Sequence, residues 1–412
     1  MKIVGIIAEF NPFHNGHKYL ISKAKEVCNA DAAVIVCSGN YVQRGMPAII
    51  NKTSRCEMAM LNGADLVIEL PVVYSTASAE LFATALNCID YLCFGCETDS
   101  IDLLNTVAEI LINEPKEYKD LLTLNLKTGI SFPKARAKAL DEYFKKYNLD
   151  YSLNINSNNY AKYPSDITSN SNLDINTFIN QPNNILGIEY IKALMRFNSK
   201  INPVPLKRLG AGYHSLDTGT KLASATGIRT AMANKDNISG LLPDNCLNII
   251  KNHTTIEYND FSTVLGSKLL SMDTLDHIEG INQDLSNRIA NNKYNFTDIE
   301  TFIPMLQSKN YTYSAISRAL LHIILDIKTD DIKEFVNNNY AMILGFTKKS
   351  GVLSEISKST KIPLVSKFAT FYKEADNNQR KMLDINLKAD NLYRMIYMNK
   401  TSEILPTEFQ RQ

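Results

Sequence analysis

The first 100 residues alternate between short apolar runs and amphipathic segments. Four apolar, β-branched runs predict buried parallel strands at residues 3–10, 32–37, 65–70 and 91–94. Apolar residues at helical spacing predict helices between them, at residues 16–27, 52–61 and 77–86. Strands and helices that alternate in this way predict an α/β fold with a parallel, doubly wound sheet. In such sheets ligands bind at the carboxyl ends of the strands.

The pattern changes after residue 100. Helices are expected over residues 101–149, and the polar, asparagine-rich residues 150–184 predict a long flexible loop with room for one short helix. Further elements are predicted as a helix at 185–197, a strand at 203–209 and a helix at 225–233. From about residue 243 the helical pattern continues without a convincing strand, for example at 315–327 and 381–397. We therefore expect two domains, an α/β domain over residues 1–242 and an all-helical domain over residues 243–412.

Composition narrows the class of protein. Of the 412 residues 45% are hydrophobic and 21% are charged, as in an ordinary globular protein. The net charge of +1 means that a nucleic acid would have to be held by a local basic surface. Residues 151–250 are mildly basic, with 9 Lys/Arg against 6 Asp/Glu, whereas residues 1–150 have 15 against 18. The chain shows neither a signal peptide nor an apolar run of the roughly 20 residues that a membrane helix needs, so we expect a cytoplasmic protein.

Cysteine usage also favours a cytoplasmic protein. The seven cysteines lack the regular spacing of a disulfide scaffold, which is typical of reduced thiols. Cys93 and Cys96 form one CxxC, but no second pair or nearby histidine pair completes a tetrahedral metal site. We expect two buried structural thiols there rather than a zinc or redox centre, and no protein-held metal.

The strongest candidate site is His14-Asn15-Gly16-His17, at the turn between the first strand and the first helix. A helix N-terminus offers free amide donors and a positive dipole end to an anion. Gly16 lets backbone approach a ligand closely. Two imidazoles at this point could donate hydrogen bonds to charge that develops on a leaving pyrophosphate. The alternative is a pair of surface histidines beside a turn.

This HxGH sequence resembles the motif that small nucleotidyltransferases share with class I aminoacyl-tRNA synthetases. The resemblance implies that His14 and His17 bind the phosphates of ATP and stabilise the transition state of adenylyl transfer. A second element of that superfamily is a hydroxyl-rich turn with an arginine at a helix start, and residues 224–229 resemble it. Ser224, Thr226 and Arg229 are thus candidate phosphate ligands, although Ala225 and Gly227 depart from the pattern. The alternative is a helix N-cap followed by a solvated arginine.

Longer blocks resemble one bacterial family, the tRNA(Met) cytidine acetate ligases. The blocks are GIIAEFNPFHNG (5–16), SGNYVQRG (38–45), ADLVIELP (64–71), PNNILG (182–187) and PLVSK (363–367). The resemblance implies an enzyme that activates acetate with ATP as acetyl-adenylate. It then acetylates the wobble cytidine of elongator tRNA(Met) to 4-acetylcytidine. Mg²⁺ is expected as the counter-ion of ATP.

The resemblance also implies an ATP site residue by residue. The segment 7–20 matches the phosphate and adenosine loop, and Gly95 matches a glycine against which the nucleotide packs. Asn183 matches an amide contact and Arg208 a basic contact, since an arginine pairs with phosphate or stacks on adenine. A loop-capping asparagine and a solvated arginine are the alternatives. The implied ATP-binding residues are Ile7, Ala8, Glu9, Phe10, Asn11, Pro12, Phe13, His14, Asn15, Gly16, His17, Lys18, Tyr19, Leu20, Gly95, Asn183 and Arg208.

Three further assignments stay open at this point. Arg44 could bind the acetate carboxylate, bind a tRNA phosphate, or pair with Glu57. Glu69 is expected to be a buried structural carboxylate rather than a base for the cytidine amine. Lys367 and Lys381 are candidate tRNA contacts in the helical region, because phosphate contacts position a nucleic acid.

Two other function classes compete with the ligase. An adenylyltransferase that acts on a small phosphorylated metabolite shares the fold, but such an enzyme rarely needs a helical region of this size. A catalytically dead RNA-binding module would not need both histidines and Arg229.

Overall fold

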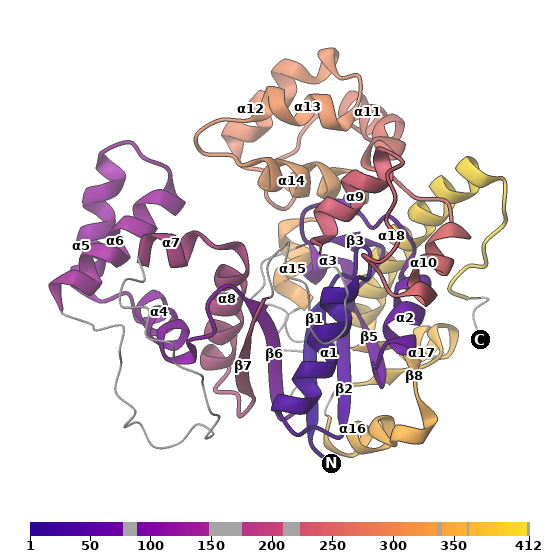
Figure 1. Ribbon diagram of the computed structural model, residues 1–412. Coiled ribbons are helices and arrows are strands. Elements are labelled where there is room, and N and C mark those ends of the chain that lie inside the picture. Colours follow the sequence, from indigo (N-terminus) through magenta and orange to yellow (C-terminus); the bar gives the residue numbers. More distant parts are fainter. Residues whose placement is uncertain (77–88, 148–174, 209–222, 336–339, 361, 410–412) are drawn as a thin grey trace.

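The computed structural model describes residues 1–76, 89–147, 175–208, 223–335, 340–360 and 362–409. In this part of the chain the central sheet has seven strands in the order β7-β6-β1-β2-β5-β8-β9 (Figure 1). The strands are β1 (Ile3–Ala8), β2 (Ala32–Ser38), β5 (Leu66–Leu70), β6 (Tyr91–Cys96), β7 (Asn202–Lys207), β8 (Ala341–Phe346) and β9 (Leu364–Val365). Neighbouring strands are parallel except β5 and β8. The predicted parallel α/β sheet is confirmed.

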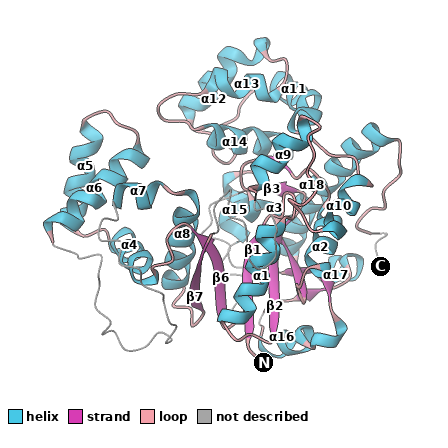
Figure 2. Ribbon diagram, in the orientation of Figure 1, coloured by secondary structure: helices cyan, strands magenta, loops and turns pink. Residues whose placement is uncertain are grey.

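Helices surround the sheet and form most of the rest of the described chain (Figure 2). They are α1 (Asn15–Val27), α2 (Lys52–Leu61), α3 (Val72–Ser75), α4 (Ile101–Asn113), α5 (Lys116–Lys127), α6 (Phe132–Lys146), α7 (Ile175–Asn180), α8 (Pro182–Arg196), α9 (Ala225–Ala233), α10 (Asp244–Lys251), α11 (Ser262–Ser271), α12 (Gln283–Asn292), α13 (Ile299–Leu306), α14 (Tyr313–Leu325), α15 (Thr329–Phe335), α16 (Val352–Ser359), α17 (Phe368–Glu374) and α18 (Asn377–Thr401). Short 3₁₀ turns are η2 (Tyr258–Phe261), η3 (Lys293–Asn295) and η4 (Lys348–Ser350).

The two faces of the sheet are buried in separate cores. In β2, Ala33 and Ile35 belong to the core that α1, α2 and α10 cover, whereas Val34 and Val36 belong to the core that includes α3, α4, α8, α14 and α18. Because β1 and β2 are buried on both faces, the side chains on both faces are apolar, and each strand is a continuous apolar run in the sequence.

The order in which the strands are added to the sheet changes side at β1. The chain runs from β1 to β2 and β5 on one side and then returns to β6 and β7 on the other. Between β1 and β6 the carboxyl ends of the strands therefore form the crevice in which doubly wound sheets bind ligands. The HxGH loop follows β1 and residues 97–99 follow β6, so both lie at this crevice.

The prediction of no strand after residue 243 is wrong. Strand β8 pairs antiparallel with β5, and β9 pairs parallel with β8 at the edge of the sheet. A run of six apolar or small residues does not distinguish a buried strand from a piece of buried helix. The remainder of this region is helical, as expected, but the sheet is completed by residues that the sequence assigned to a separate domain.

Two more elements differ from expectation. The short antiparallel hairpin of β3 (Tyr41–Val42) and β4 (Met46–Pro47) was not predicted. Helix α8 begins at Pro182, so Asn183 lies in its first turn rather than in a loop. Pro fits this position because the first helical amide needs no intrahelical acceptor. The predicted helix at 77–86 and most of the asparagine-rich stretch, residues 150–174, lie outside the described residues.

Candidate functional site

The HxGH loop is fixed by hydrogen bonds to two distant segments, one at Ile49 and one at residues 240–241. The Asn11 side-chain oxygen accepts from the Ile49 amide at 2.9 Å, and the Asn15 side chain donates to the Gly240 carbonyl at 2.8 Å. The Asn15 amide donates to the Leu241 carbonyl at 3.2 Å. Asn11 and Asn15 were both predicted to contact ATP, and the structure uses their side chains to hold the loop.

His14 and His17 cap helix α1 with their own rings. The Gly16 amide donates to Nδ1 of His14 at 3.1 Å, and the His14 amide donates to Nδ1 of His17 at 3.2 Å. Each Nδ1 is an acceptor, so each neutral ring carries its proton on Nε2. The rings stack with centroids 3.7 Å apart. Neither Nε2 has a hydrogen-bond partner in the described residues, so both N–H groups are available to a ligand.

Burial keeps both rings neutral. His14 is only 4% exposed, so the alternative of surface histidines beside a turn is wrong for this residue. Burial, and secondly the charge of Arg208, lower the pKa of His14 to about 3. Burial, His14 and Arg208 hold the pKa of His17 well below its ordinary value. Neutral imidazoles donate hydrogen bonds at neutral pH without the desolvation cost of a buried cation.

A pH dependence of folding follows. In the unfolded chain His14 has a pKa near 6.5, but in the folded chain its pKa is about 3. The free energy of unfolding is therefore unaffected by His14 above pH 6.5 and decreases as the pH falls from 6.5 toward 3. At pH 5 we expect His14 to cost about 2 kcal/mol. Urea unfolding at pH 7 and pH 5 measures it. His14→Asn keeps an acceptor for the Gly16 amide but has no imidazole to protonate. Between pH 7 and pH 5 its free energy of unfolding should therefore fall by about 2 kcal/mol less than that of the wild type. An equal fall in both proteins would contradict the prediction.

The hydroxyl-rich turn at residues 224–229 is hydrogen-bonded to the HxGH loop. Ser224 caps helix α9 by accepting from the Gly227 amide at 3.1 Å. Arg229 is half-buried, donates to the Asn11 carbonyl at 2.7 Å and donates to the Thr226 hydroxyl at 3.0 Å. The alternative of a solvated arginine is therefore wrong for Arg229, which binds the HxGH loop directly.

On the β6 side, Arg208 and Asn183 meet. Arg208 follows β7, and its Nη1 donates to the Asn183 side-chain oxygen at 2.8 Å. A Cβ on Gly95 would come within 3.1 Å of Arg208 Cγ, so the absence of a side chain there lets Arg208 lie across β6. The predicted residues Gly95, Asn183 and Arg208 thus form one cluster beside the crevice.

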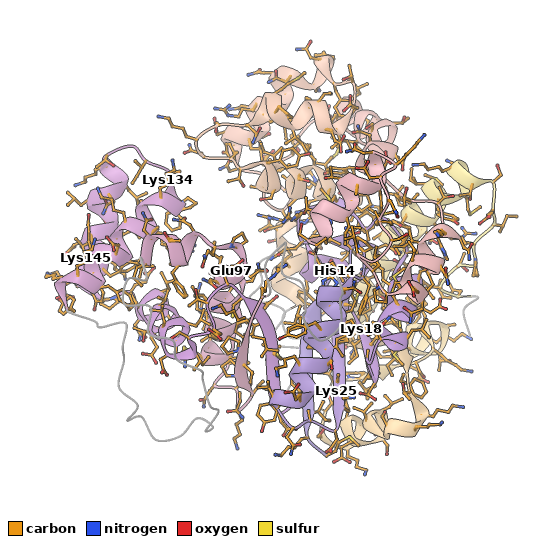
Figure 3. The ribbon with its side chains drawn as sticks, viewed as in Figure 1. His14, Lys18, Lys25, Glu97, Lys134 and Lys145 are labelled. Atoms are coloured by element: carbon orange, nitrogen blue, oxygen red, sulfur yellow. The ribbon has the colours of Figure 1, made fainter. Side chains whose placement is uncertain are left out.

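Glu97 was missed by sequence reasoning and organises this cluster. Its carboxylate accepts from the Asn183 side chain at 2.5 Å and from the Asn184 amide at 3.0 Å, at the N-terminus of α8. Asn184 is fully buried and accepts from the Glu97 and Thr98 amides at 3.0 and 3.1 Å. The two adjacent asparagines of the PNN block were the sequence signal for this cluster. Figure 3 shows Glu97 and His14 at the same edge of the sheet, with Lys25 at the far end of α1.

The other predicted ATP residues divide between core and rim. Ile7 and Ala8 end β1, and Glu9 accepts the Gln43 amide at 2.9 Å. The rings of Phe10 and Phe13 pack against His17, with centroids 4.9 and 5.6 Å from it. The buried Pro12 continues this loop, whereas Tyr19 is 38% exposed and Leu20 packs on the α1 core. Lys18 and Asn15 help to line an open hollow of about 400 Å³ beside residues 240–245.

Glu69 has a structural role. Its two oxygens accept from the buried Lys52 ammonium at 2.9 and 2.8 Å. The cysteines of the CxxC are also buried, and burial raises the pKa of Cys96 to about 12, which suppresses thiolate chemistry. Among the described residues there is no group of three or more His, Cys, Asp or Glu side chains arranged to hold a metal. The same part of the chain contains no helix long and apolar enough to cross a bilayer.

The two candidate tRNA lysines differ. Lys367 is exposed at the N-terminus of α17. Lys381 pairs with Asp331 at 3.0 Å, and the Asp331 side chain is only 5% exposed. Lys381 therefore compensates a buried carboxylate, which explains its presence without an RNA.

Comparisons with known proteins agree with this geometry. A sequence model of the family described as HIGH Nucleotidyl Transferase matches residues 1–407. The chain is 35% identical to the tRNA(Met) cytidine acetate ligase of Halothermothrix orenii, covering 96% of this chain and 95% of that protein. It is 36% identical to that of Thermoanaerobacter sp. (strain X514), covering 97% of each. The crystal structure of Thermotoga maritima TmcAL bound with alpha-thio ATP matches with a TM-score of 0.82 at 30% identity, covering 96% of this chain and 95% of that one.

Proposed function

Since the chain belongs to the tRNA(Met) cytidine acetate ligase family of the HIGH nucleotidyl transferases, we propose that it activates acetate with ATP and acetylates the wobble cytidine of elongator tRNA(Met) to 4-acetylcytidine. The observation that carries the proposal is the pair of neutral, stacked histidines whose Nε2–H groups face no partner in the described chain. They lie at the crevice between β1 and β6, where a triphosphate would meet the N-terminus of α1.

The proposed chemistry has two steps. An acetate oxygen attacks the α-phosphorus of ATP. The bond from this phosphorus to the oxygen that bridges the α- and β-phosphates breaks, and pyrophosphate leaves. The cytidine amine then attacks the acetyl carbon, loses a proton, and AMP leaves. His14 and His17 donate to phosphate oxygens as charge develops on the departing pyrophosphate, and Arg208 and Arg229 neutralise it.

The remaining residues of the ATP site have supporting roles in this proposal. Asn11 and Asn15 hold the loop, while Glu97 orients Asn183 toward Arg208. Mg²⁺ would arrive with ATP and be held mainly by phosphate oxygens and water, as is usual for this ion. The proposal includes a cytoplasmic location, because the proposed substrate is a tRNA.

For tRNA docking, the exposed Lys367 at the N-terminus of α17 stays a candidate. A charge reversal at Lys381 would break its pair with the buried Asp331, so it would test stability instead of RNA binding.

The function is tested with wild-type protein. Acetate-dependent exchange of labelled pyrophosphate into ATP should proceed without RNA, because acetyl-adenylate forms first. With elongator tRNA(Met) and labelled acetate, mass spectrometry of nucleosides should detect labelled 4-acetylcytidine. Exchange that requires a phosphorylated metabolite instead of acetate would identify an adenylyltransferase, and the absence of labelled acetylcytidine would overturn the proposal.

A further inference from the structure

The β3–β4 hairpin is held rigidly between the nucleotide loop and helix α14. On one side the Gln43 amide donates to Glu9 Oε1 at 2.9 Å. On the other side the Ser317 hydroxyl donates to the Gly45 carbonyl at 3.0 Å. Gly45 has a φ of 77°, and a Cβ at this position would overlap the backbone of Arg318. The tip of the hairpin therefore has a fixed position relative to the loop.

Arg44 lies at this tip and is exposed. Its side chain makes no hydrogen bond or ion pair with the residues that the structure describes, and the pairing with Glu57 considered from the sequence is not formed. Arg229 binds the Asn11 carbonyl, so the two arginines flank loop residues 9–11. Burial, and secondly the like charge of Arg44, lower the pKa of Arg229. Arg44 extends from a fixed backbone near another cation and pairs with no carboxylate of the described residues, which is an arrangement suited to binding an anion.

Three anions come to the proposed site, and the geometry separates them. The ATP phosphates already have His14, His17, Arg208 and Arg229. Acetate must react at the α-phosphate, where water has to be excluded to protect the acyl-adenylate. The exposed tip at Arg44 is poorly suited to that. The remaining anion is the backbone of the RNA, which must approach from solvent.

We propose that Arg44 binds a phosphate of the tRNA strand beside the acceptor cytidine and so positions this base at loop 9–11. The proposal rests on the proposed function. A guanidinium is suited to this task because its planar fork binds two phosphate oxygens at once. One contact at the hairpin tip would fix the register of the RNA at the reacting amine, while other surfaces bind the rest of the molecule.

The test compares Arg44→Ala, Arg44→Lys and the control Lys251→Gln, which removes an exposed charge at the end of α10. For Arg44→Ala we expect KM for tRNA to rise about tenfold or more, as for loss of a charged hydrogen bond. The slope of log affinity against log salt should become shallower by about one. Arg44→Lys should recover part of the loss, because it restores charge without the fork. Lys251→Gln should behave as wild type.

The first half-reaction distinguishes the alternatives. Acetate-dependent pyrophosphate exchange without RNA should be unchanged in Arg44→Ala. A raised KM for ATP or acetate in that assay would overturn the proposal and assign Arg44 to the small substrates. An unchanged KM for tRNA would overturn it as well. If wild-type protein shows neither exchange nor tRNA acetylation, the proposed function itself fails, and this result is distinct from either outcome for the variant.

Discussion

Alanine at either His14 or His17 is expected to slow acetate-dependent ATP–pyrophosphate exchange by about a hundredfold or more, the usual effect of losing one donor to developing charge. Each ring offers an Nε2–H that has no partner among the described residues, and its Nδ1 is occupied by a backbone amide. The measurement is the exchange rate at saturating ATP and acetate.

Alanine also removes the helix cap, so matched variants are needed. In His14→Asn the side-chain oxygen takes the place of Nδ1 and can still accept from the Gly16 amide, since asparagine is a good N-cap. The donor at the position of Nε2 is lost. In His14→Gln the longer side chain can place an amide donor near the position of Nε2, but the cap is lost.

If the donors carry the effect, His14→Asn should be as slow as His14→Ala although its thermal stability is close to wild type. His14→Gln should retain more activity than His14→Asn. The same pair of changes applies to His17, whose Nδ1 accepts from the His14 amide. Wild-type exchange rates in His14→Asn and His17→Asn would show that the rings serve only to cap the helix.

The sequence predicted the elements whose pattern is unambiguous. Strands β1 and β2 are continuous β-branched runs that are buried on both faces, and helix α2 has the predicted bounds at residues 52–61. Strand β8 was missed because its six residues pair with β5, from which they are separated by more than 270 positions. Nothing local distinguishes such a run from a buried helix.

The site shows the same division. The HxGH motif could be located from its own residues, but the contact of Arg229 with the Asn11 carbonyl joins positions 218 residues apart. Glu97 was missed because its role depends on α8 being placed across the end of β6. Lys381 was a candidate tRNA contact because a lysine on a helix looks solvated. Its ion pair with Asp331 could not be predicted from the sequence, because Asp331 is buried by tertiary packing.

The second large effect is expected at Lys52 in helix α2, which connects strand β5 to helix α18 and the C-terminal segment. Its side chain is 2% exposed, and its ammonium lies 2.8 Å from Glu69, 2.6 Å from Asp390 in α18 and 3.2 Å from Glu408 near the C-terminus. Lys52→Met leaves these carboxylates without their shared cation. Breaking a buried pair in this way costs about 3–5 kcal/mol of the free energy of unfolding.

The control is Lys25→Met. Lys25 pairs with Asp65 at 2.8 Å, but its side chain is 31% exposed, so its loss should cost less than about 1 kcal/mol. Urea unfolding of both variants at pH 7 gives the comparison. If Lys52→Met is no more destabilising than Lys25→Met, the buried cluster does not stabilise the fold.

The pH dependence gives a second check on the same cluster. Burial raises the pKa of Glu69 to about 7 even though Lys52 opposes the shift. Removing Lys52 should raise that pKa further, so the folded variant binds a proton that the unfolded chain releases. A carboxyl with a raised folded pKa contributes stability at low pH and loses it as pH rises. The deficit of Lys52→Met should therefore be smaller at pH 5.5 than at pH 8, and adding Glu69→Gln should reduce the deficit at pH 8. A deficit that is equal at both pH values would show that it comes from lost packing of the lysine stem and not from the unpaired charge.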